Sequence, residues 1–306
     1  MIIRIFNQLV RGFAMGAADI VPGVSGGTVA LLLGIYDKLV GEIRAGSGAL
    51  GVLVRGEVKE FVARFKTIDW VFLLSLLTGI GLAVVTLVSW LRTQIEEHPV
   101  QVSAVFFGLV AASVVLTVRE VKTWDALRIT LSFVMAVAAF ILLGLRSGAI
   151  VDPALIVVLL AGSVAICAMI LPGISGSFIL LMFGLYDHIT EAIEERHLST
   201  IAVFGAGAVL GLALFSTLLN WLLLRHRDTV MAILIGLLAG SLRVLWPWPA
   251  GGPDGASGLE NVGLGSPVSG EVAGALFGAV VAAVAVVFLS EIARRTNTSG
   301  EAALGS

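Results

Sequence analysis

Two copies of a Pro-Gly-x-Ser-Gly motif carry the residues of this chain that are best suited to bind a ligand. The segment Pro22–Asp37 recurs 150 positions later as Pro172–Asp187, and eight of the sixteen positions are identical. Proline removes a backbone donor and glycine accepts the dihedral angles of a sharp turn, so each motif is expected to end one helix and start another. The first amides of a helix lack partners within it and lie at its positive end, which suits such a turn to an anion.

The small and hydroxyl-bearing residues of the two motifs form the candidate anion site. Two such turns facing one another would hold a phosphate or carboxylate without a buried Lys or Arg, an arrangement typical of secondary transporters with inverted broken helices. The alternative is that the glycines only allow close packing and the serines only cap helices. The candidate residues are Gly23, Ser25, Gly26, Gly27 and Thr28 in the first motif, and Gly173, Ser175, Gly176 and Ser177 in the second.

Asp19 lies three residues before Pro22 in apolar sequence. A carboxylate inside a membrane is costly and indicates a function. Asp19 is either a proton site that couples transport to a proton gradient, or a local cap that accepts hydrogen bonds from the amides of Gly23 or Val24. The second copy has Met169 at this position, so neither role is shared between the copies.

Three further residues mark predicted helix ends. Arg243, in the segment Gly240–Pro247, either extends to the lipid headgroups, as a terminal Arg does, or captures an anionic headgroup from the outer leaflet. Tyr36 and Tyr186 each precede an Asp, and we expect them to anchor the helices at the water boundary rather than to contact substrate.

The composition places the chain among polytopic membrane proteins. Of its 306 residues 58% are apolar and 13% charged, and the mean hydropathy is +1.03. The net charge of −2 argues against nucleic-acid binding, and a single cysteine, Cys167, excludes an intrachain disulfide and a cysteine metal cluster. No His-Glu-x-x-His and no phosphate-loop Lys are present, and no His is placed by any recognisable pattern to serve as a base for Ser25, so we expect no catalytic residues, no metal and no cofactor.

Apolar runs of about 20 residues predict six membrane spans. They lie roughly at residues 70–91, 100–118, 127–145, 199–224, 230–246 and 271–292. Two more apolar stretches, roughly 5–45 and 153–192, are each split by the motif and predict re-entrant hairpins that enter and leave by the same face. The predicted fold is therefore an all-α membrane protein with two repeats, 1–150 and 151–306, each a hairpin followed by three transmembrane helices.

Three spans per repeat is an odd number, so the second repeat must be inserted upside down. With cytoplasmic termini, fifteen of the 19 Lys and Arg residues lie on the inner side. The other four, Arg92, Arg146, Arg196 and Arg243, lie on the outer side. A cell (inner) membrane protein whose two hairpins meet near the midplane is expected. The similarity of Gly108–Ser113 to Gly236–Ser241 supports the same division weakly.

Two segments outside the spans have a distinct character. Apolar and basic residues alternate at helical spacing over about 52–66, which predicts an interfacial helix on the cytoplasmic surface. The outer loop 247–269 is rich in Gly and Ser, and we expect it to be mobile, with Trp246 and Trp248 at the outer interface.

The motifs Asp19–Thr28, Pro172–Ser177 and Gly240–Pro247 resemble a prokaryotic membrane family that is regarded as undecaprenyl-phosphate translocases. The resemblance covers nearly the whole chain. It implies transport of a polyprenyl-phosphate carrier lipid from the outer to the inner leaflet for reuse in cell-envelope synthesis, with the nine motif residues around the phosphate. The second copy departs at Ser177 and Phe178, so unequal contributions from the two turns are expected.

Two other functions remain open at the level of the residues. A transporter or channel for a small soluble anion would use the same helix-terminus chemistry. A membrane phosphatase acting on the pyrophosphorylated carrier would also use inverted hairpins, but it needs a Glu, His and Arg near the turn, and neither motif carries that set.

Overall fold

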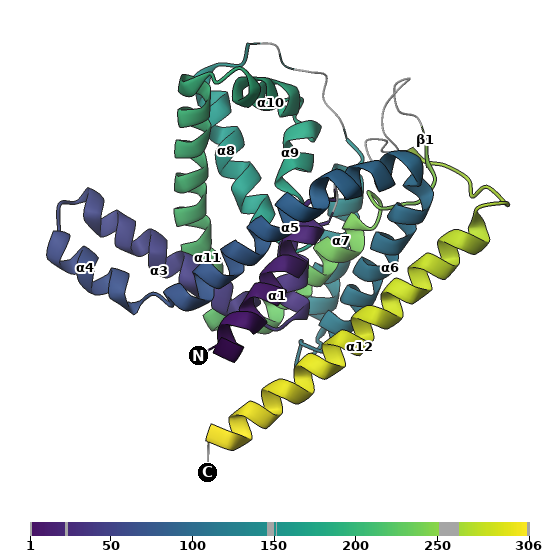
Figure 1. Ribbon diagram of the computed structural model, residues 1–306, viewed down its shortest axis with the longest axis horizontal. Coiled ribbons are helices and arrows are strands. Elements are labelled where there is room, and N and C mark those ends of the chain that lie inside the picture. Colours follow the sequence, from purple (N-terminus) through teal and green to yellow (C-terminus); the bar gives the residue numbers. More distant parts are fainter. Residues whose placement is uncertain (1, 22–23, 146–149, 151, 251–262, 305–306) are drawn as a thin grey trace.

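A computed structural model describes residues 2–21, 24–145, 150, 152–250 and 263–304. Over these residues the chain is almost entirely helical, with one pair of two-residue strands (Figure 1). The helices are α1 (Ile2–Asp19), α2 (Gly26–Leu32), α3 (Tyr36–Val54), α4 (Val58–Thr67), α5 (Trp70–Glu97), α6 (Pro99–Val118), α7 (Ala126–Leu142), α8 (Leu155–Ile170), α9 (Gly176–Met182), α10 (Tyr186–Glu194), α11 (Leu198–Ser241) and α12 (Val272–Leu304).

The helices match the predicted spans closely. Among the described residues, α5, α6 and α11 are long and apolar enough to cross a membrane, and α7, α8 and the 272–288 part of α12 are shorter apolar helices. The prediction of an all-helical membrane protein is confirmed at this level. Two predicted spans are joined in the 44-residue helix α11, which is kinked at His226 (φ −136°, ψ 41°).

Each predicted hairpin contains a second break that the sequence analysis did not anticipate. After the Pro-Gly turn comes a helix of only seven residues, α2 or α9. Two residues after these helices end, Gly34 and Gly184 have φ angles of +67° and +68°, in the left-handed region that favours glycine. The stretches 5–45 and 153–192 therefore each hold a long helix, a seven-residue helix and a third helix.

Glycines let the long helix of each stretch pack directly on the backbone of the span that follows. A Cβ on Gly12 of α1 would lie 2.2 Å from the carbonyl oxygen of Leu76, and one on Gly79 of α5 would lie 2.2 Å from that of Leu9. In the second part of the chain, a Cβ on Gly162 of α8 would lie 2.2 Å from the oxygen of Phe204 in α11. Such close approach is typical of packing between membrane helices.

The last helix of each part packs against the other part of the chain. A Cβ on Gly108 of α6 would lie 2.1 Å from the carbonyl oxygen of Ala279 in α12. A Cβ on Gly236 of α11 would lie 2.2 Å from that of Ser132 in α7. The segments beginning at Gly108 and Gly236, which the sequence analysis found similar, therefore make corresponding contacts.

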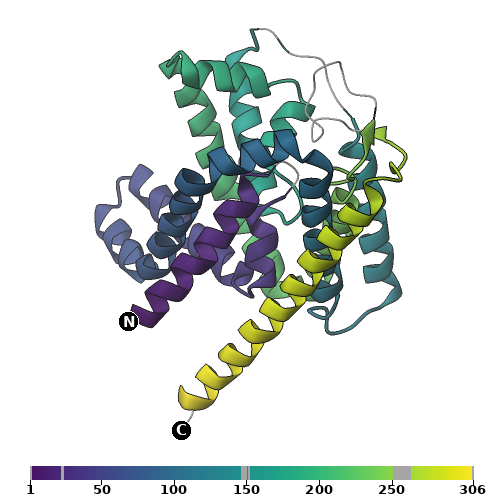
Figure 2. The ribbon, with the colours of Figure 1, turned by 45° about the vertical axis from the view of Figure 1, so that its right-hand side comes forward.

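The helix predicted over 52–66 is displaced along the chain. Residues 52–54 belong to α3, Gly56 turns the chain with a φ of +81°, and α4 covers Val58–Thr67. Helices α3 and α4 project together from one side of the molecule (Figures 1 and 2). Val58, Val62 and Phe65 of α4 are exposed, so the helix has an apolar surface that is not covered by this chain.

The loop between α11 and α12 is closed by strands β1 (Pro249–Ala250) and β2 (Gly263–Leu264), which pair antiparallel. The indole Nε1 of Trp246 donates to the carbonyl of Gly265 at 3.0 Å, and that of Trp248 donates to Glu271 at 3.1 Å. Residues 251–262, the centre of the loop expected to be mobile, lie outside the described residues.

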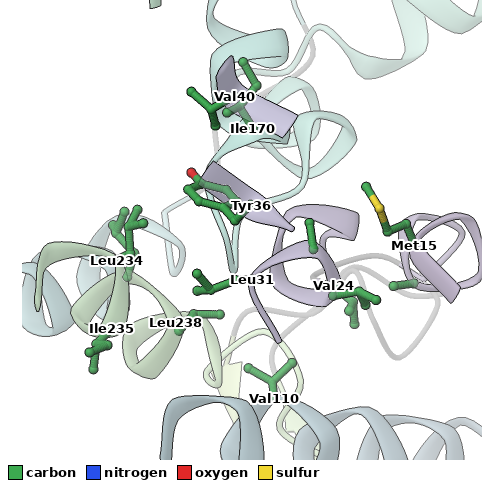
Figure 3. Close-up of a cluster of buried hydrophobic side chains, with 14 of the residues drawn as sticks. Met15, Val24, Leu31, Tyr36, Val40, Val110, Ile170, Leu234, Ile235 and Leu238 are labelled. Carbon is green, nitrogen blue, oxygen red and sulfur yellow. The ribbon is translucent and has the colours of Figure 1, made fainter. Parts of the chain in front are cut away.

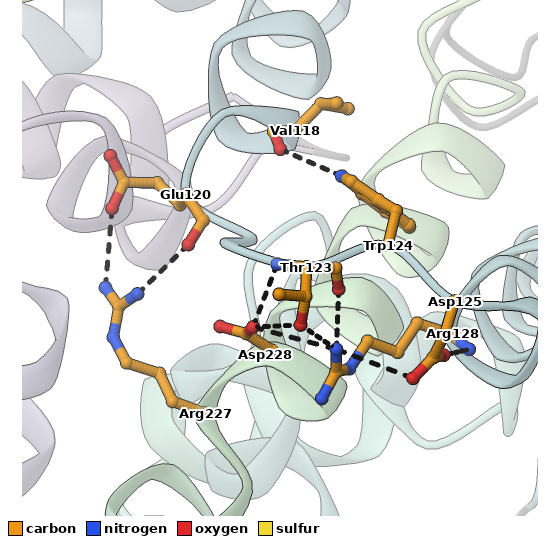
Figure 4. Close-up of polar contacts among 8 residues, drawn as sticks. All are labelled: Val118, Glu120, Thr123, Trp124, Asp125, Arg128, Arg227 and Asp228. Carbon is orange, nitrogen blue, oxygen red and sulfur yellow. Dashed lines mark hydrogen bonds and ion pairs between the residues drawn. The ribbon is translucent and has the colours of Figure 1, made fainter.

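Polar contacts hold the kink of α11 against the ends of other helices (Figure 4). Arg227 Nε donates to Asp37 Oδ2 at 3.0 Å, and its NH1 donates to the carbonyl of Glu120 at 3.2 Å. Asp228 accepts from the backbone amide and the hydroxyl of Thr123 at 3.2 and 3.1 Å. These contacts tie the kink to the start of α3 and to the segment between α6 and α7.

The main buried cluster contains Tyr36 together with Val24 and Ile170, which lie near the two motifs in sequence (Figure 3). Tyr36 is only 2% exposed, and its hydroxyl has no hydrogen-bond partner among the described residues. The expectation that Tyr36 anchors the chain at the water boundary is therefore wrong, because the break at Gly34 directs the start of α3 into the core. Tyr186, its counterpart, is 37% exposed.

Candidate functional site

The two Pro-Gly turns are in direct contact although they are about half the chain apart in sequence. The amide of Gly173 donates to Thr28 Oγ1 at 2.9 Å. Ser25 Oγ donates toward the carbonyl oxygens of Met169 and Leu171, at 3.3 and 3.4 Å. Thr28 is fully buried and Ser25 is 1% exposed, so these polar groups meet inside the protein.

In the first turn, side chains of the protein accept hydrogen bonds from the amides of Gly26 and Gly27, which were expected to be free for a ligand. Ser25 caps α2, and its Oγ accepts from the amide of Gly27 at 3.1 Å. Asp19 Oδ1 accepts from the amide of Gly26 at 2.6 Å. Asp19 therefore accepts from Gly26, which was not one of the two expected donors: Val24 donates to the carbonyl of Val21, and Gly23 lies outside the described residues.

The second turn has a different set of hydrogen bonds. Ser175 does not cap α9; its hydroxyl is instead 2.8 Å from that of Ser177. Where Asp19 stands in the first copy, the second has Met169, and a Cβ on Gly176 would lie 2.6 Å from the Met169 side chain. The second turn therefore lacks a carboxylate over its first amide.

Like Gly176, three other glycines of the motifs are close to protein atoms. A Cβ on Gly27 would lie 2.9 Å from the carbonyl oxygen of Ile170, and one on Gly26 would lie 2.5 Å from Asp19 Oδ2. Gly173 has a φ of +86°, and its Cβ would lie 2.9 Å from Ser241 Oγ. Gly27 thus allows the first turn to approach the end of α8, whereas Gly26 packs on Asp19 and Gly173 packs on α11; these contacts fit the alternative that the glycines allow close packing.

Ser241 is a neighbour of the turns that the sequence analysis did not single out. It is fully buried at the end of α11, donates to the carbonyl of Leu238 at 2.9 Å and packs on Gly173. The sequence offered a signal for Ser241, because Ser241 and Ser113 are the last residues of the two similar segments. Both residues are fully buried in the structure.

Comparisons with known proteins identify the family of the chain. The family model described as undecaprenyl phosphate translocase-like matches residues 15–252, which include both turns. The chain belongs to this family. Among curated relatives, a polyprenyl-phosphate transporter of Vibrio cholerae serotype O1 is 40% identical over 242 residues, covering 79% of this chain and 78% of the relative. A polyprenyl-phosphate transporter of Staphylococcus aureus is 31% identical over 257 residues, covering 78% of this chain and 86% of the relative.

No solved structure matches the chain at a significant level. The names of the family and of both relatives describe translocation or transport, not an enzyme, which is the class of function that the sequence predicted.

In this member of the family, Arg243 lies against α7. Its guanidinium carbon is 4.6 Å from the centre of the Phe140 ring, a cation–π contact, and the same group fills the space beside Gly144. Arg243 follows Ser241 by two residues, so the backbone that carries it is close to the second turn while its side chain points to the end of α7.

Within the described part of the chain, no three His, Cys, Asp or Glu side chains are grouped as a metal site would require. The polar atoms at the junction of the turns are hydroxyls, backbone amides, the carbonyl oxygens of Met169 and Leu171, and one carboxylate. Hydroxyl and amide donors can coordinate phosphate oxygens, as they do at helix N-termini.

Proposed function

We propose that this protein carries a polyprenyl phosphate, undecaprenyl phosphate or a related carrier lipid, from the outer to the inner leaflet of the cell membrane. The observation that carries the proposal is the buried contact between the two turns, through Thr28 and Gly173, in a chain that belongs to the undecaprenyl phosphate translocase-like family. Curated relatives named as polyprenyl-phosphate transporters support the substrate class.

The physical problem in such a reaction is the headgroup. Burying a phosphate without partners is prohibitively costly, whereas the prenyl tail is soluble in hydrocarbon. Hydroxyls of Ser25, Thr28, Ser175 and Ser177 and the amides of the glycines beside them would replace the water around the phosphate. Gly23 is part of the proposed set by its place in the motif.

Corresponding contacts support an inverted repeat with halves 1–150 and 151–306. In each half the helix before the turn packs through glycine on the first span, as α1 does on α5 and α8 on α11. The second span of each half contacts the third span of the other, as α6 contacts α12 and α11 contacts α7. Re-entrant stretches related in this way would reach the site from opposite faces.

The distribution of Lys and Arg supports an orientation with both termini in the cytoplasm of an inner-membrane protein. Helix α4 then lies at the cytoplasmic interface. Its exposed Val58, Val62 and Phe65 would enter the lipid, while Lys59 and Lys66 would attract anionic headgroups.

Entry of a phosphate requires the turns to separate, because Gly173 donates to Thr28 and Ser25 faces Met169 and Leu171. Rocking of one half against the other would expose the site to each leaflet in turn. Asp19 is the proposed coupling group: its carboxylate covers the amide of Gly26 and would repel a phosphate unless it takes up a proton.

Exchange of a labelled polyprenyl phosphate between the leaflets of proteoliposomes tests the proposal. Ser25→Leu and Ser175→Leu each place a bulky apolar side chain between the turns and should abolish exchange. Ser89→Leu, at an exposed position of α5, is the matched control and should exchange at the wild-type rate.

Wild-type rates in both turn variants would remove the proposed site. Failure of the wild-type protein to exchange the lipid, together with uptake of inorganic phosphate into the same vesicles, would favour a small-anion transporter instead.

A further inference from the structure

Arg11 is a cation without a protein partner on the inner part of α1. The residue is half-buried, and among the described residues no hydrogen bond or ion pair involves its guanidinium. Arg4, two turns earlier, is paired with Asp69. A partly buried Arg in an apolar protein is costly unless it has a counter-ion. Its position therefore points to a negative group that the described residues do not supply.

Gln8, one turn before Arg11, is a second polar side chain that lacks a partner, although its unpartnered atom is an acceptor. It is only 8% exposed, and its Oε1 has no hydrogen-bond partner among the described residues. An unsatisfied buried amide costs free energy, so such groups are uncommon without a ligand or water. A carboxamide offers two N–H donors beside its acceptor oxygen and can bind an oxyanion.

Arg11 shares a face of α1 with two alanines that line an apolar cavity. Positions three and seven apart share a helix face, so Arg11 lies below Ala14 and Ala18. These two alanines line a cavity of about 270 Å³ between α1 and α2 on one side and α6 and α12 on the other. Helices α1 and α12 have their termini at the same end of the molecule (Figures 1 and 2).

The lining of this cavity is suited to hydrocarbon. Its other walls include Leu33, Phe106, Leu109 and Val286. Ser290 is its one polar lining side chain, and the hydroxyl is already bonded to the carbonyl of Val287 at 2.8 Å. A free phosphate ion would find no partner in the cavity, whereas a branched hydrocarbon chain would bury apolar surface there.

We propose that Arg11 and Gln8 hold the phosphate of the carrier lipid at a second seat, on the N-terminal side of the turns, with the first isoprene units in the cavity beside Ala14. This inference rests on the proposed function and adds a place for the lipid before or after it passes the turns. Arg11 precedes Asp19 by eight residues, about 12 Å along the helix, so the two sites are distinct.

The chemistry of this second seat explains why it needs both the Arg11 guanidinium and the apolar cavity. A guanidinium presents paired N–H donors that match two phosphate oxygens, and its hydrogen bonds to an anion are stronger than neutral ones. The cavity is smaller than the usual pocket for a whole drug-sized ligand, roughly 300–1,000 Å³. It therefore holds only the head-proximal part of the tail, and the remainder stays in the bilayer.

Two variants and two matched controls test this seat. Arg11→Gln removes the charge, and Ala14→Trp fills the cavity. Arg225→Gln removes an exposed arginine, and Ala213→Trp makes the same substitution in a different groove, lined by α3, α4, α5 and α11. Leaflet exchange in proteoliposomes should fall about tenfold or more in the first two variants. It should stay at the wild-type rate in the controls, and Arg11→Lys should recover part of the loss.

A binding measurement on the wild-type protein makes the test independent of mutant folding. A short-chain prenyl phosphate with a photoreactive tail should crosslink to residues around Ala14, Leu33 and Leu109. Excess unlabelled prenyl phosphate should prevent crosslinking, and inorganic phosphate at the same concentration should not. Protection by inorganic phosphate alone would show that a free anion, not the lipid, occupies Arg11.

The outcomes separate this inference from the proposed function. If the wild-type protein exchanges the lipid while Arg11→Gln and Ala14→Trp exchange it equally fast, the second seat is refuted and the turn site remains. Absence of crosslinks in the cavity would also refute the seat. If the wild-type protein exchanges no lipid, the proposed function itself fails.

Discussion

Asp19 and Gly26 form the most constrained pair at the first turn. The carboxylate accepts the amide hydrogen of Gly26 at 2.6 Å, and a Cβ on Gly26 would lie 2.5 Å from its other oxygen. The same side chain therefore caps the short helix α2 and excludes any larger residue from position 26.

Replacing Asp19 separates its role as an acceptor from its role as a charge. Asp19→Asn retains an oxygen for the amide of Gly26, so the melting temperature in detergent should change little. Asp19→Leu leaves that amide unsatisfied and should cost about 1–3 kcal/mol of folding free energy. Equal stability of the Leu variant and the wild-type protein would show that the cap contributes nothing.

The Asn variant also tests coupling to protons. If Asp19 carries the proton, exchange by the wild-type protein responds to a pH gradient and exchange by Asp19→Asn does not. An equal response in both proteins would exclude Asp19 as the proton site.

At this scale the sequence predicted which residues meet, but not the bonds that they make. Both motifs were identified from their residue types, yet Thr28 bonds Gly173 and Ser25 faces Met169 across more than 140 positions. Local spacing cannot reveal such partners. The carboxylate of Asp19 could only be assigned to nearby amides, and the turn geometry selects Gly26 from among them.

At the scale of elements, the packing of α1 on α5 depends on glycines that face a neighbouring backbone. Gly79→Ala would place a Cβ 2.2 Å from the carbonyl oxygen of Leu9, and such overpacking should cost about 1–3 kcal/mol. Gly81→Ala, on the same helix, meets no atom within 4 Å and should be neutral or stabilising by up to about 1 kcal/mol.

Thermal unfolding of the two variants in detergent measures this difference, because they share the helix and the substitution. Equal melting temperatures would mean that α1 and α5 do not remain in close contact.

The elements themselves were largely predictable because about 20 apolar residues in succession decide a membrane helix. The joining of two spans into α11 could not be predicted, since the charged segment from Arg225 to Asp228 is typical of a loop. In the structure, contacts of Arg227 and Asp228 with other helices hold that segment in a kinked helix. The breaks at Gly34 and Gly184 had a local signal, because the glycine recurs in both copies of the motif.

At the scale of the whole molecule, Asp69 joins three elements at one end of the fold. It caps α5 by accepting from the amide of Phe72 at 3.1 Å, pairs with Lys38 of α3 at 2.5 Å and pairs with Arg4 of α1. Burial raises the pKa of Asp69, but the hydrogen bonds from Lys38 and Phe72 and the charges of Lys38 and Arg4 outweigh it. They hold this pKa below its ordinary value of 3.8.

A carboxyl group with a lowered folded-state pKa stabilises the fold when it is ionised. That stabilisation is present above about pH 3.8 and is lost as the pH falls through the lower folded value. Asp69→Asn keeps the helix cap but removes the charge. The wild-type protein should therefore melt at a higher temperature than Asp69→Asn at pH 7, and the difference should shrink below pH 4. A constant difference across this range would show that the charge is not the cause.

The last helix of each part of the chain packs against the other part, and this affects the order in which the protein can fold. A chain emerges from the ribosome starting at its N-terminus, and N-terminal regions generally fold first. The glycine face of α6 nevertheless receives α12, the last helix to be synthesised. Native assembly of the first half therefore cannot be completed until nearly the entire polypeptide has entered the bilayer, and Gly108 stays exposed to lipid throughout that delay.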